Sequence, residues 1–365
     1  MDHRGRQQRL QDSLSAAYRL DALLVTHLPN ILYLCGFSGS AGVLVFTDSK
    51  AVFFTDGRYT TQARAEVQGA RVVIARKPTL LAAAEWLAAH SRSGRRGSPV
   101  RVGIEAEHLT VSERTRLARI LPAGFRLRET NGLVEELRMV KEAGEIRRIR
   151  DAVTLGASLF DRALEVIRPG VTEADVAAEM EYTARRAGAQ AMSFPTIIAA
   201  GERSALPHAR ASAAVIAQGF VVCDFGVILA GYCSDRTRTV HVGRPSAEAS
   251  RAYHAVLRGQ EAAIAAVKPG VAVSEVDHAA RKLLQDNDLA KYFSHSTGHG
   301  VGLEIHEAPR VAAGQTPILR PGMVITIEPG VYLPGKWGVR IEDMVIVTER
   351  GCEVLTPTRK ELIAI

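Results

Sequence analysis

Apolar and polar positions along the first third of the chain predict helices and strands in turn. The period over residues 4–19 is typical of an amphipathic helix, whereas short apolar runs over residues 21–27 and 71–75 predict strands. The runs GVLVFT and AVFFT flank Asp48 and Ser49 and predict a hairpin. A helix is expected after TDGRY and another over TLLAAAEWLAAH, and VRVGIE predicts a further strand. Together these elements predict a small α/β domain.

A second domain is expected to follow. The segment NGLVEELRMVKEAGEIRRIRDA carries the chain over into a long helix, and a length of 365 residues favours two domains over one. We therefore predict a first domain over residues 1–132 and a second over residues 133–365, with the boundary near Gly132.

The second domain contains an internal repeat. Residues 159–176 are echoed by residues 259–276, and in both copies an amphipathic helix stops at Pro-Gly and a second helix starts soon after. Thr172 and Ser274 are the candidate N-caps of these second helices. The repeat predicts one domain of two similar halves, with helices outside and a sheet within.

Each half ends in a strand-rich segment that carries two carboxylates, at the end of one apolar run and within the next extended run. These residues are Asp224 and Asp235 in the first half, and Glu328 and Glu342 in the second. Folding the halves together about a pseudo-two-fold axis would bring all four carboxylates to one point. Mutual repulsion and desolvation would then raise their pKa values and destabilise the fold unless cations were bound.

A pair of divalent cations resolves this conflict. The glycine-rich segment SHSTGHGVGLEIHEAP supplies the imidazoles of His295, His299 and His306. Oxygen-rich coordination with an imidazole suits Mn²⁺, and also Co²⁺ or Zn²⁺. Two such ions about 3.5–4 Å apart can bridge a hydroxide and polarise a carbonyl, which is the chemistry of metal-assisted hydrolysis.

Composition narrows the other possibilities. The net charge of +7 invites a nucleic-acid interpretation, but the basic cluster of Arg92, Arg95 and Arg96 lies among Ser and Gly without aromatic residues and is typical of a solvated loop. Four scattered cysteines form no CxxC pair, which favours a reducing compartment. We find no signal peptide and no run able to span a bilayer. The expectation is a cytoplasmic protein without nucleic-acid or membrane partners.

The stretches SALPHA, CDFG, GYCSDRTRT, TGHGVGLEIHE, IEPGVY and GVRIED resemble, in order and spacing, the metallopeptidases of the pita-bread fold. This class, peptidase family M24, includes methionine aminopeptidase, prolidase and Xaa-Pro aminopeptidase. The resemblance covers the catalytic domain from about Leu133 and a creatinase-type N-terminal domain before it. It implies an α/β (α+β) protein whose C-terminal domain has the pita-bread (creatinase/aminopeptidase) fold.

The resemblance also implies roles for individual residues. Asp224 would hold one metal ion, and His299 with Glu328 the other, while Asp235 and Glu342 would bridge the two. The remaining catalytic residues would be His208, His295, His306, Tyr332 and Arg340. A metal-bridging hydroxide would attack the scissile carbonyl, and Glu328 would carry a proton to the leaving proline nitrogen.

Within the class, the resemblance favours one activity. The N-terminal domain argues against methionine aminopeptidase, and the complete ligand set argues against creatinase. The segment YLCGFSGSAGVLVFTDSKAVFFTDGRY is more similar to short bacterial Xaa-Pro aminopeptidases, which release the residue before a proline from peptides. The alternative is a prolidase, an Xaa-Pro dipeptidase restricted to dipeptides. A catalytically inactive pita-bread module that only binds a peptide or protein is the rival from another class.

Members of this class are commonly homodimers in which the N-terminal domain helps to close the partner's active site. The TDGRY segment, with Asp56, Arg58 and Tyr59, is a candidate for that role. A helix N-terminus preceded by a turn explains the same residues equally well. The expected partners are a proline-containing peptide substrate and a second copy of the chain.

Overall fold

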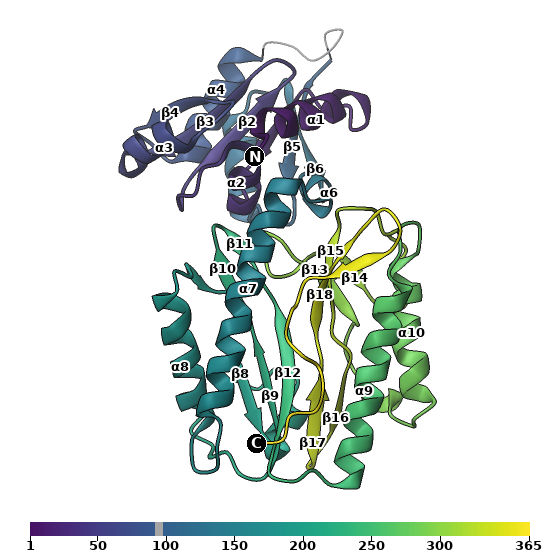
Figure 1. The fold of residues 1–365 in the computed structure, drawn as a ribbon. Helices are drawn as coiled ribbons and strands as arrows, with labels where there is room; N and C mark the ends of the chain where they lie inside the picture. Colours follow the sequence, from purple (N-terminus) through teal and green to yellow (C-terminus); the bar gives the residue numbers. More distant parts are fainter. Residues whose placement is uncertain (92–97) are drawn as a thin grey trace. The chain divides into compact units, whose positions relative to one another are not determined.

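The computed structural model describes residues 1–91 and 98–365 and divides into two compact units, Met1–Arg138 and Met139–Ile365 (Figure 1). The predicted boundary near Gly132 lies shortly before this division. The basic cluster of Arg92, Arg95 and Arg96 falls outside the described residues. Within the described residues, no helix is both long and apolar enough to cross a membrane.

The first unit is built on a six-stranded mixed sheet. The strands lie in the order β4 (Arg71–Ala75), β3 (Ala51–Asp56), β2 (Val43–Thr47), β1 (Ala22–Val25), β5 (Val100–Glu105) and β6 (Phe125–Thr130). Its helices are α1 (His3–Ala16), α2 (Leu28–Cys35), α3 (Thr60–Glu66), α4 (Thr79–His90), α5 (Val111–Ile120) and α6 (Glu135–Met139). Strands β2 and β3 pair antiparallel, which confirms the predicted hairpin. Leucines and alanines of α4 and α5 cover one face of the sheet.

In the TDGRY segment, Thr55 and Asp56 end β3, and Gly57–Tyr59 form a short 3₁₀ turn that leads into α3. Asp56 caps this 3₁₀ turn, because its Oδ1 accepts a hydrogen bond from the backbone N–H of Arg58 at 3.0 Å. The interpretation as a helix start with a preceding turn is therefore correct for this segment. The role at a partner's active site stays a prediction.

The predicted long helix begins within the segment NGLVEELRMVKEAGEIRRIRDA, at Ala143. Helix α7 covers Ala143–Val166, and Glu142 caps it in a capping box with Glu145. The two preceding residues pair with a strand segment instead, since the Lys141 N–H donates to the Gly322 carbonyl at 2.9 Å and Val140 bridges Met323. Tertiary hydrogen bonds therefore take the backbone groups that a longer helix would need.

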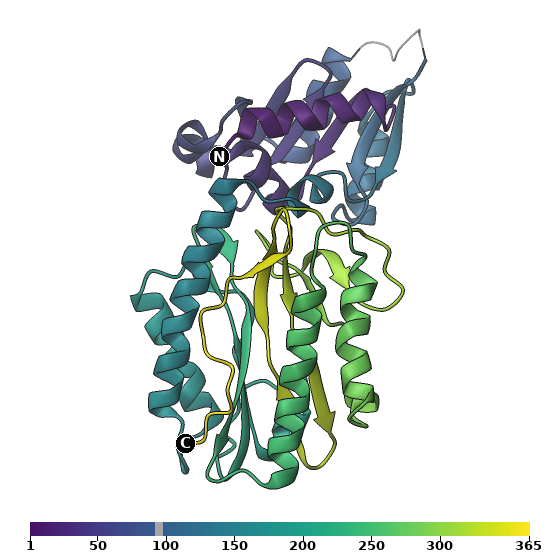
Figure 2. The same ribbon diagram turned by 45° about the vertical axis from the view of Figure 1, so that its right-hand side comes forward.

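The second unit has two similar halves, each a helical pair on antiparallel strands (Figures 1 and 2). In the first half, α7 and α8 (Glu173–Arg186) pack against β8 (Ile197–Ala200), β9 (Gly219–Phe225) and β12 (Arg236–Val242). In the second half, α9 (Ala247–Ala266) and α10 (Val273–Gln285) pack against a sheet made of β14 (Glu307–Val311), β13 (Gly298–Gly300), β15 (Val324–Ile327), β18 (Asp343–Val347) and β19 (Cys352–Val354). The predicted α/β class with an internal two-fold repeat is confirmed.

Each half also carries a small inserted hairpin between its two central strands. Strands β10 (Val227–Leu229) and β11 (Tyr232–Cys233) pair between β9 and β12, and β7 (Ala191–Met192) joins them. Strands β16 (Gly330–Leu333) and β17 (Trp337–Arg340) pair between β15 and β18. The 3₁₀ turns Gly201–Ala205 and Ala290–Tyr292 complete the described elements of this unit.

The two predicted N-caps have different outcomes. Thr172 caps α8 as predicted, in a capping box with Asp175. The prediction for Ser274 is wrong, because α10 begins at Val273 and Ala272 is its N-cap. Ala272 is the counterpart of Thr172 in the repeat, and each forms an isolated bridge, Thr172 with Val215 and Ala272 with Ile318. The repeat therefore fixes the helix start even where no side chain caps it.

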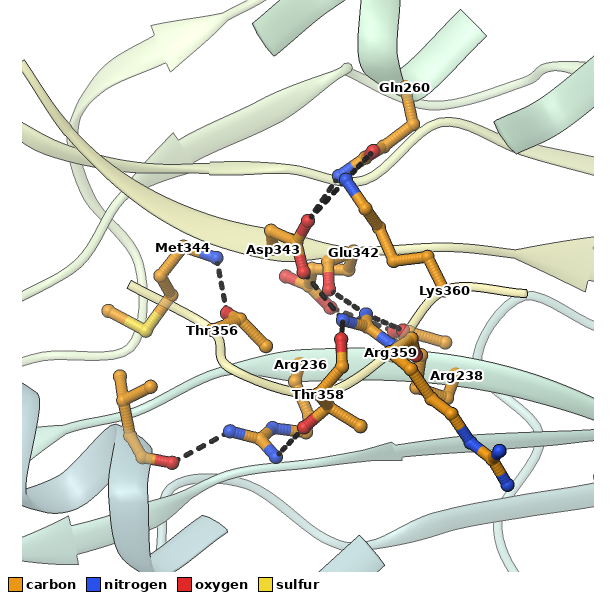
Figure 3. A network of polar contacts seen from close by, with 12 residues as sticks. Arg236, Arg238, Gln260, Glu342, Asp343, Met344, Thr356, Thr358, Arg359 and Lys360 are labelled. Atoms are coloured by element: carbon orange, nitrogen blue, oxygen red, sulfur yellow. Dashed lines mark hydrogen bonds and ion pairs between the residues drawn. The ribbon is translucent and has the colours of Figure 1, made fainter. Parts of the chain in front are cut away.

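A buried polar network holds the halves and the C-terminal segment together (Figure 3). Arg236 and Arg238 are each only 1% exposed, and both donate to the C-terminal segment, Arg236 to Thr358 Oγ1 at 2.7 Å and Arg238 to the Thr358 carbonyl at 2.7 Å. Arg238 Nη2 also pairs with Asp343 Oδ1 at 2.7 Å, and its Nη1 donates to the Glu342 carbonyl at 2.5 Å. One guanidinium thus ties the first half to the second.

We expect Asp343→Ala to lower the free energy of unfolding of the metal-free protein by about 3–5 kcal/mol, because it leaves the buried Arg238 guanidinium without its counter-ion. Asp343 is fully buried and also accepts from Gln260 Nε2 at 2.8 Å. Urea unfolding followed by circular dichroism measures the change. The control is Asp151→Ala, an exposed carboxylate on α7 whose loss should cost within about 0.5 kcal/mol. Equal costs for the two variants would contradict this account of the network.

Candidate active site and metal centre

Strand alternation turns the carboxylates away from the covering helices. Along β9, Val221, Cys223 and Phe225 pack against the α7–α8 side, so Asp224 faces the opposite side. Along β15, Ile325 and Ile327 pack against the α9–α10 side, and Glu328 continues the opposite face. Both sheets therefore present acidic side chains toward the space between the halves.

The strand registers bring the partners of each carboxylate pair close. Asp224 lies opposite Thr237, two residues beyond Asp235, so that Asp224 and Asp235 are diagonal neighbours on one face. In the second half, Ile327 lies opposite Asp343, so Glu328 and Glu342 are the next facing positions. The sheets join where the Glu342 N–H donates to the Thr237 carbonyl at 3.1 Å.

These side chains line a cavity of about 610 Å³ in the second unit. The sequence-predicted residues in its wall are Asp224, Asp235, Glu328, Glu342, His208, His295, His299, His306 and Arg340. Tyr332 is not in the wall; its hydroxyl lies behind, in hydrogen-bond contact with His295 and Arg340. The structure thus brings all ten predicted site residues into one region.

His299 is oriented by its own strand. Its Nδ1 lies 3.0 Å from the Gly300 carbonyl and donates to it, which leaves the Nε2 lone pair free. This Nε2 lies 3.5 Å from Asp235 Oδ2 and 3.4 Å from Glu328 Oε1. Gly298, the residue before His299, allows β13 to pack closely on β15. A Cβ at this position would lie 1.9 Å from the Thr326 carbonyl oxygen.

The donor set fits a divalent cation. Ligand atoms of Asp235, His299 and Glu342 all lie within 4.8 Å of one another. Among the buried side-chain atoms of the described residues, Asp224 Oδ1 and Glu342 Oε1 have no hydrogen-bond partner. Buried oxygens that lack a donor are costly, and a bound cation would satisfy them.

Arg340 is the cation already present beside the carboxylates. It is 3% exposed, and its Nη2 lies 2.5 Å from Asp224 Oδ2. Its Nη1 donates to the Tyr332 hydroxyl at 2.5 Å, and that hydroxyl lies 2.9 Å from His295 Nε2. His295 Nδ1 donates to the Ser296 carbonyl at 2.8 Å, so Nε2 accepts from Tyr332. Donation therefore runs outward from Arg340, to Asp224 on one side and through the Tyr332 hydroxyl to His295 on the other.

Burial shifts the pKa values of these groups strongly. Desolvation, with the charge of Asp224 second, raises the pKa of Asp235 well above its ordinary value. Desolvation and then Asp235 do the same for Glu342. Desolvation raises the pKa of Glu328 to about 8, although Arg340 opposes the shift. Desolvation lowers the pKa of His295 and of His299 to about 4, so both imidazoles are neutral at pH 7.

Several cavity residues were missed by sequence reasoning. Arg210 and Arg310 add two cationic side chains to the wall, and Phe194, Ile197 and Ile305 add apolar surface. The sequence did hold one signal for the two arginines, which is their closeness along the chain to predicted site residues. Arg210 lies two residues after His208, and Arg310 lies four residues after His306. That signal did not separate them from the many other arginines of a basic chain.

Comparison with known protein families agrees with this architecture. Residues 147–349 match metallopeptidase family M24, and residues 6–140 match the creatinase/prolidase N-terminal domain. An Xaa-Pro dipeptidase from Pyrococcus horikoshii is 36% identical over 349 residues, which cover 94% of this chain and 95% of that protein.

Solved structures resemble the whole chain. An Xaa-Pro dipeptidase from Bacillus anthracis matches with a TM-score of 0.94 at 38% identity, covering all of both chains. An X-Pro aminopeptidase from Thermotoga maritima matches with a TM-score of 0.87 at 33% identity, covering 99% of this chain and all of the other. The predicted resemblance to the pita-bread metallopeptidases is thereby confirmed.

We expect the metal-free protein to lose stability as the pH rises from about 5 to 9. The folded-state pKa values of Asp235, Glu328 and Glu342 are raised above the unfolded values near 4, so the stability is fully present below the unfolded pKa and is lost as the pH rises through the folded pKa. The loss is about 1.4 kcal/mol per pH unit for each proton that only the folded state retains.

Urea unfolding in a chelator at several pH values measures this trend. Addition of Mn²⁺ should reverse it, because metal binding favours the ionised carboxylates. Asp235→Asn removes one titrating group and should flatten the dependence. Uniform stability of the chelated protein across this range would contradict the prediction.

Proposed function

The chain belongs to metallopeptidase family M24 with a creatinase/prolidase N-terminal domain, and from this premise we propose that it hydrolyses the bond between an N-terminal residue and a following proline. The observation that carries the proposal is the cluster of buried carboxylates around His299 in one cavity of the metallopeptidase unit. The names of the relatives from Pyrococcus horikoshii and Bacillus anthracis support the Xaa-Pro bond as the target.

The family implies divalent metal ions, and the residues present fit them. We assign Asp224 to one ion, His299 and Glu328 to the other, and Asp235 and Glu342 to both. When bound, the ions polarise the scissile carbonyl and make water a nucleophile at neutral pH. Four carboxylates and one imidazole suit Mn²⁺, with Co²⁺ and Zn²⁺ as other candidates. The orphaned oxygens of Asp224 and Glu342 support this assignment.

The chain's own side chains supply the proton transfers and the positioning. Glu328 lies in the cavity wall beside His299, where it can take up the proton that the attacking water loses and deliver it to the prolyl nitrogen, which must be protonated to leave. His208 and His306 line the cavity and can donate hydrogen bonds to the substrate and to the developing oxyanion. The Arg340–Tyr332–His295 chain holds His295 in one orientation.

Within this activity, we infer a preference for dipeptides over longer peptides. A dipeptide carries its free carboxylate next to the proline ring, and Arg210 and Arg310 place two cationic side chains in the cavity wall. The sequence favoured an aminopeptidase acting on longer peptides instead. Likeness to the Thermotoga maritima X-Pro aminopeptidase keeps that activity as the second candidate. The homodimer, the cytoplasmic location and manganese as the physiological metal stay predictions.

Product analysis by mass spectrometry tests the proposal. A manganese-loaded sample receives Ala-Pro, Ala-Pro-Ala and Ala-Ala separately, with a chelated sample as the control. We expect metal-dependent release of alanine from Ala-Pro and little from Ala-Pro-Ala. Efficient cleavage of the tripeptide after alanine would establish the aminopeptidase instead. Cleavage of none of the peptides by a metal-loaded sample would contradict the Xaa-Pro activity.

Substitution of the cavity arginines tests the inferred dipeptide preference. We expect Arg310→Gln or Arg210→Gln to lower kcat/KM for Ala-Pro about 10- to 100-fold, the value of a charge-assisted hydrogen bond. The same variants should change kcat/KM for Ala-Pro-amide, which lacks the carboxylate, less than about threefold. Arg147→Gln, at an exposed position on α7, is the matched control. Equal losses on both substrates would assign these arginines another role.

A further inference from the structure

The loop of residues 201–211 forms one side of the candidate active site. It begins with the 3₁₀ turn Gly201–Ala205 and then brings Pro207, His208 and Arg210 into the cavity wall. Leu206 is 53% exposed, so little apolar packing restrains this part of the loop. Ala209 is buried against Val222 and gives it one apolar anchor.

Both ends of this loop meet at a single carboxylate. Glu173, in the first turn of α8, is completely buried. It accepts a hydrogen bond from the Ala200 N–H at 2.9 Å, from the Ser212 N–H at 3.1 Å and from Ser212 Oγ at 2.7 Å. Ala200 and Ser212 are the residues that flank the loop, so Glu173 closes its neck.

Arg203 extends this clamp into the loop. Its Nε lies 3.0 Å from both Glu173 oxygens, and its Nη2 donates to the Arg210 carbonyl at 2.8 Å. On the far side, Arg340 Nη1 donates to the Pro207 carbonyl at 3.1 Å while pairing with Asp224. The backbone on both sides of His208 is thus hydrogen-bonded, by Arg340 on one side and by the Glu173–Arg203 pair on the other.

The same carboxylate is not required to start its helix. Thr172 and Asp175 cap α8 without it, through hydrogen bonds of Thr172 Oγ1 to Asp175 Oδ2 at 2.6 Å and of the Asp175 N–H to Thr172 Oγ1 at 3.1 Å. In the other half of the repeat, the counterpart of Glu173 is Val273, which packs in the core while α10 still forms. The buried carboxylate of Glu173 therefore holds the loop by hydrogen bonds, and it is not needed to form the helix that both halves share.

We propose that Glu173 is a positioning residue that holds the loop of residues 201–211 closed, and thereby fixes His208 against the substrate. The inference rests on the proposed function, in which His208 contacts substrate. Pinning both ends of a loop removes most of its conformational freedom before binding, so less entropy is lost when the substrate binds. Loss of the clamp should then weaken catalysis through His208 without disturbing the metal ligands.

Glu173→Gln is the sharpest test. Its amide nitrogen would put an N–H donor against N–H donors at the neck, which breaks the clamp with almost no change in volume. Asp175→Asn is the matched control, since it makes the same chemical change two residues away, at the exposed cap of the same helix. Both variants are compared with the parent protein as full-length, manganese-loaded chains.

Limited trypsin digestion with mass spectrometry reports the loop directly. Arg203 and Arg210 are cleavage sites inside it, and we expect Glu173→Gln to speed cleavage after these residues about tenfold or more, as local opening becomes easier. Asp175→Asn should leave that rate unchanged. Unchanged cleavage in Glu173→Gln would overturn the proposal. Ser212→Ala, which removes one donor from the clamp, should give a smaller increase and serves if Glu173→Gln fails to fold.

A double-mutant cycle distinguishes positioning from general destabilisation. The substrate is Ala-Pro-amide, which lacks the carboxylate assigned to Arg210 of the same loop; on it, Glu173→Gln alone should lower kcat/KM about tenfold, whereas in a His208→Ala background it should cost less than about twofold. Metal analysis should still find the parent's metal content. Full additivity with His208→Ala, or loss of metal, would overturn the proposal. Should the parent protein cleave no Xaa-Pro peptide, the proposed function fails, while the trypsin comparison still decides whether Glu173 closes the loop.

Discussion

The burial of four carboxylates at one point is the constraint on which the rest of the second unit depends. Asp235 and Glu342 are 5% and 2% exposed, and the charges of their neighbours add to the cost of burial. Among the described residues, Arg340 is the arginine that pairs directly with one of these carboxylates, Asp224. The remaining charge requires divalent cations or retained protons. Stability, metal binding and catalysis are therefore coupled through the same few side chains.

The surrounding polar networks keep this costly site in one geometry. Behind Glu342, the buried guanidinium of Arg238 binds the Glu342 carbonyl, the Asp343 carboxylate and the C-terminal segment (Figure 3). On α10, Asp277 accepts from Thr297 Oγ1 at 2.8 Å, and the Thr297 carbonyl in turn accepts from the Glu328 N–H at 2.8 Å. Each half thus contributes one buried polar side chain outside the cavity, Arg238 or Asp277, whose hydrogen bonds hold the backbone at Glu342 or Glu328.

Much of the fold follows from local sequence signals, and the exceptions have identifiable causes. The hairpin around Asp48 and helix α4 formed as predicted because apolar pattern and turn chemistry agree there. The long helix α7 begins only at Ala143, because Val140 and Lys141 are hydrogen-bonded to a distant strand segment. Ser274 failed as an N-cap because a backbone bridge, and not a capping side chain, fixes the start of α10. At the start of each of these two helices, long-range backbone hydrogen bonds and not local signals set the boundary.

The sequence by itself determined the two halves and the four carboxylates that converge, because these residues stand at matched positions of an internal repeat. Its motifs also determined the class, through their resemblance to the pita-bread metallopeptidases. Only the tertiary structure decided which further side chains line the cavity or hold the site residues in place. Arg310, Arg238 and Glu173 carry no local signal that separates them from other charged residues. Their roles come from distances between segments far apart in the chain, such as Glu173 to Ser212 and Arg238 to Asp343, and such distances are set only when the strands pack.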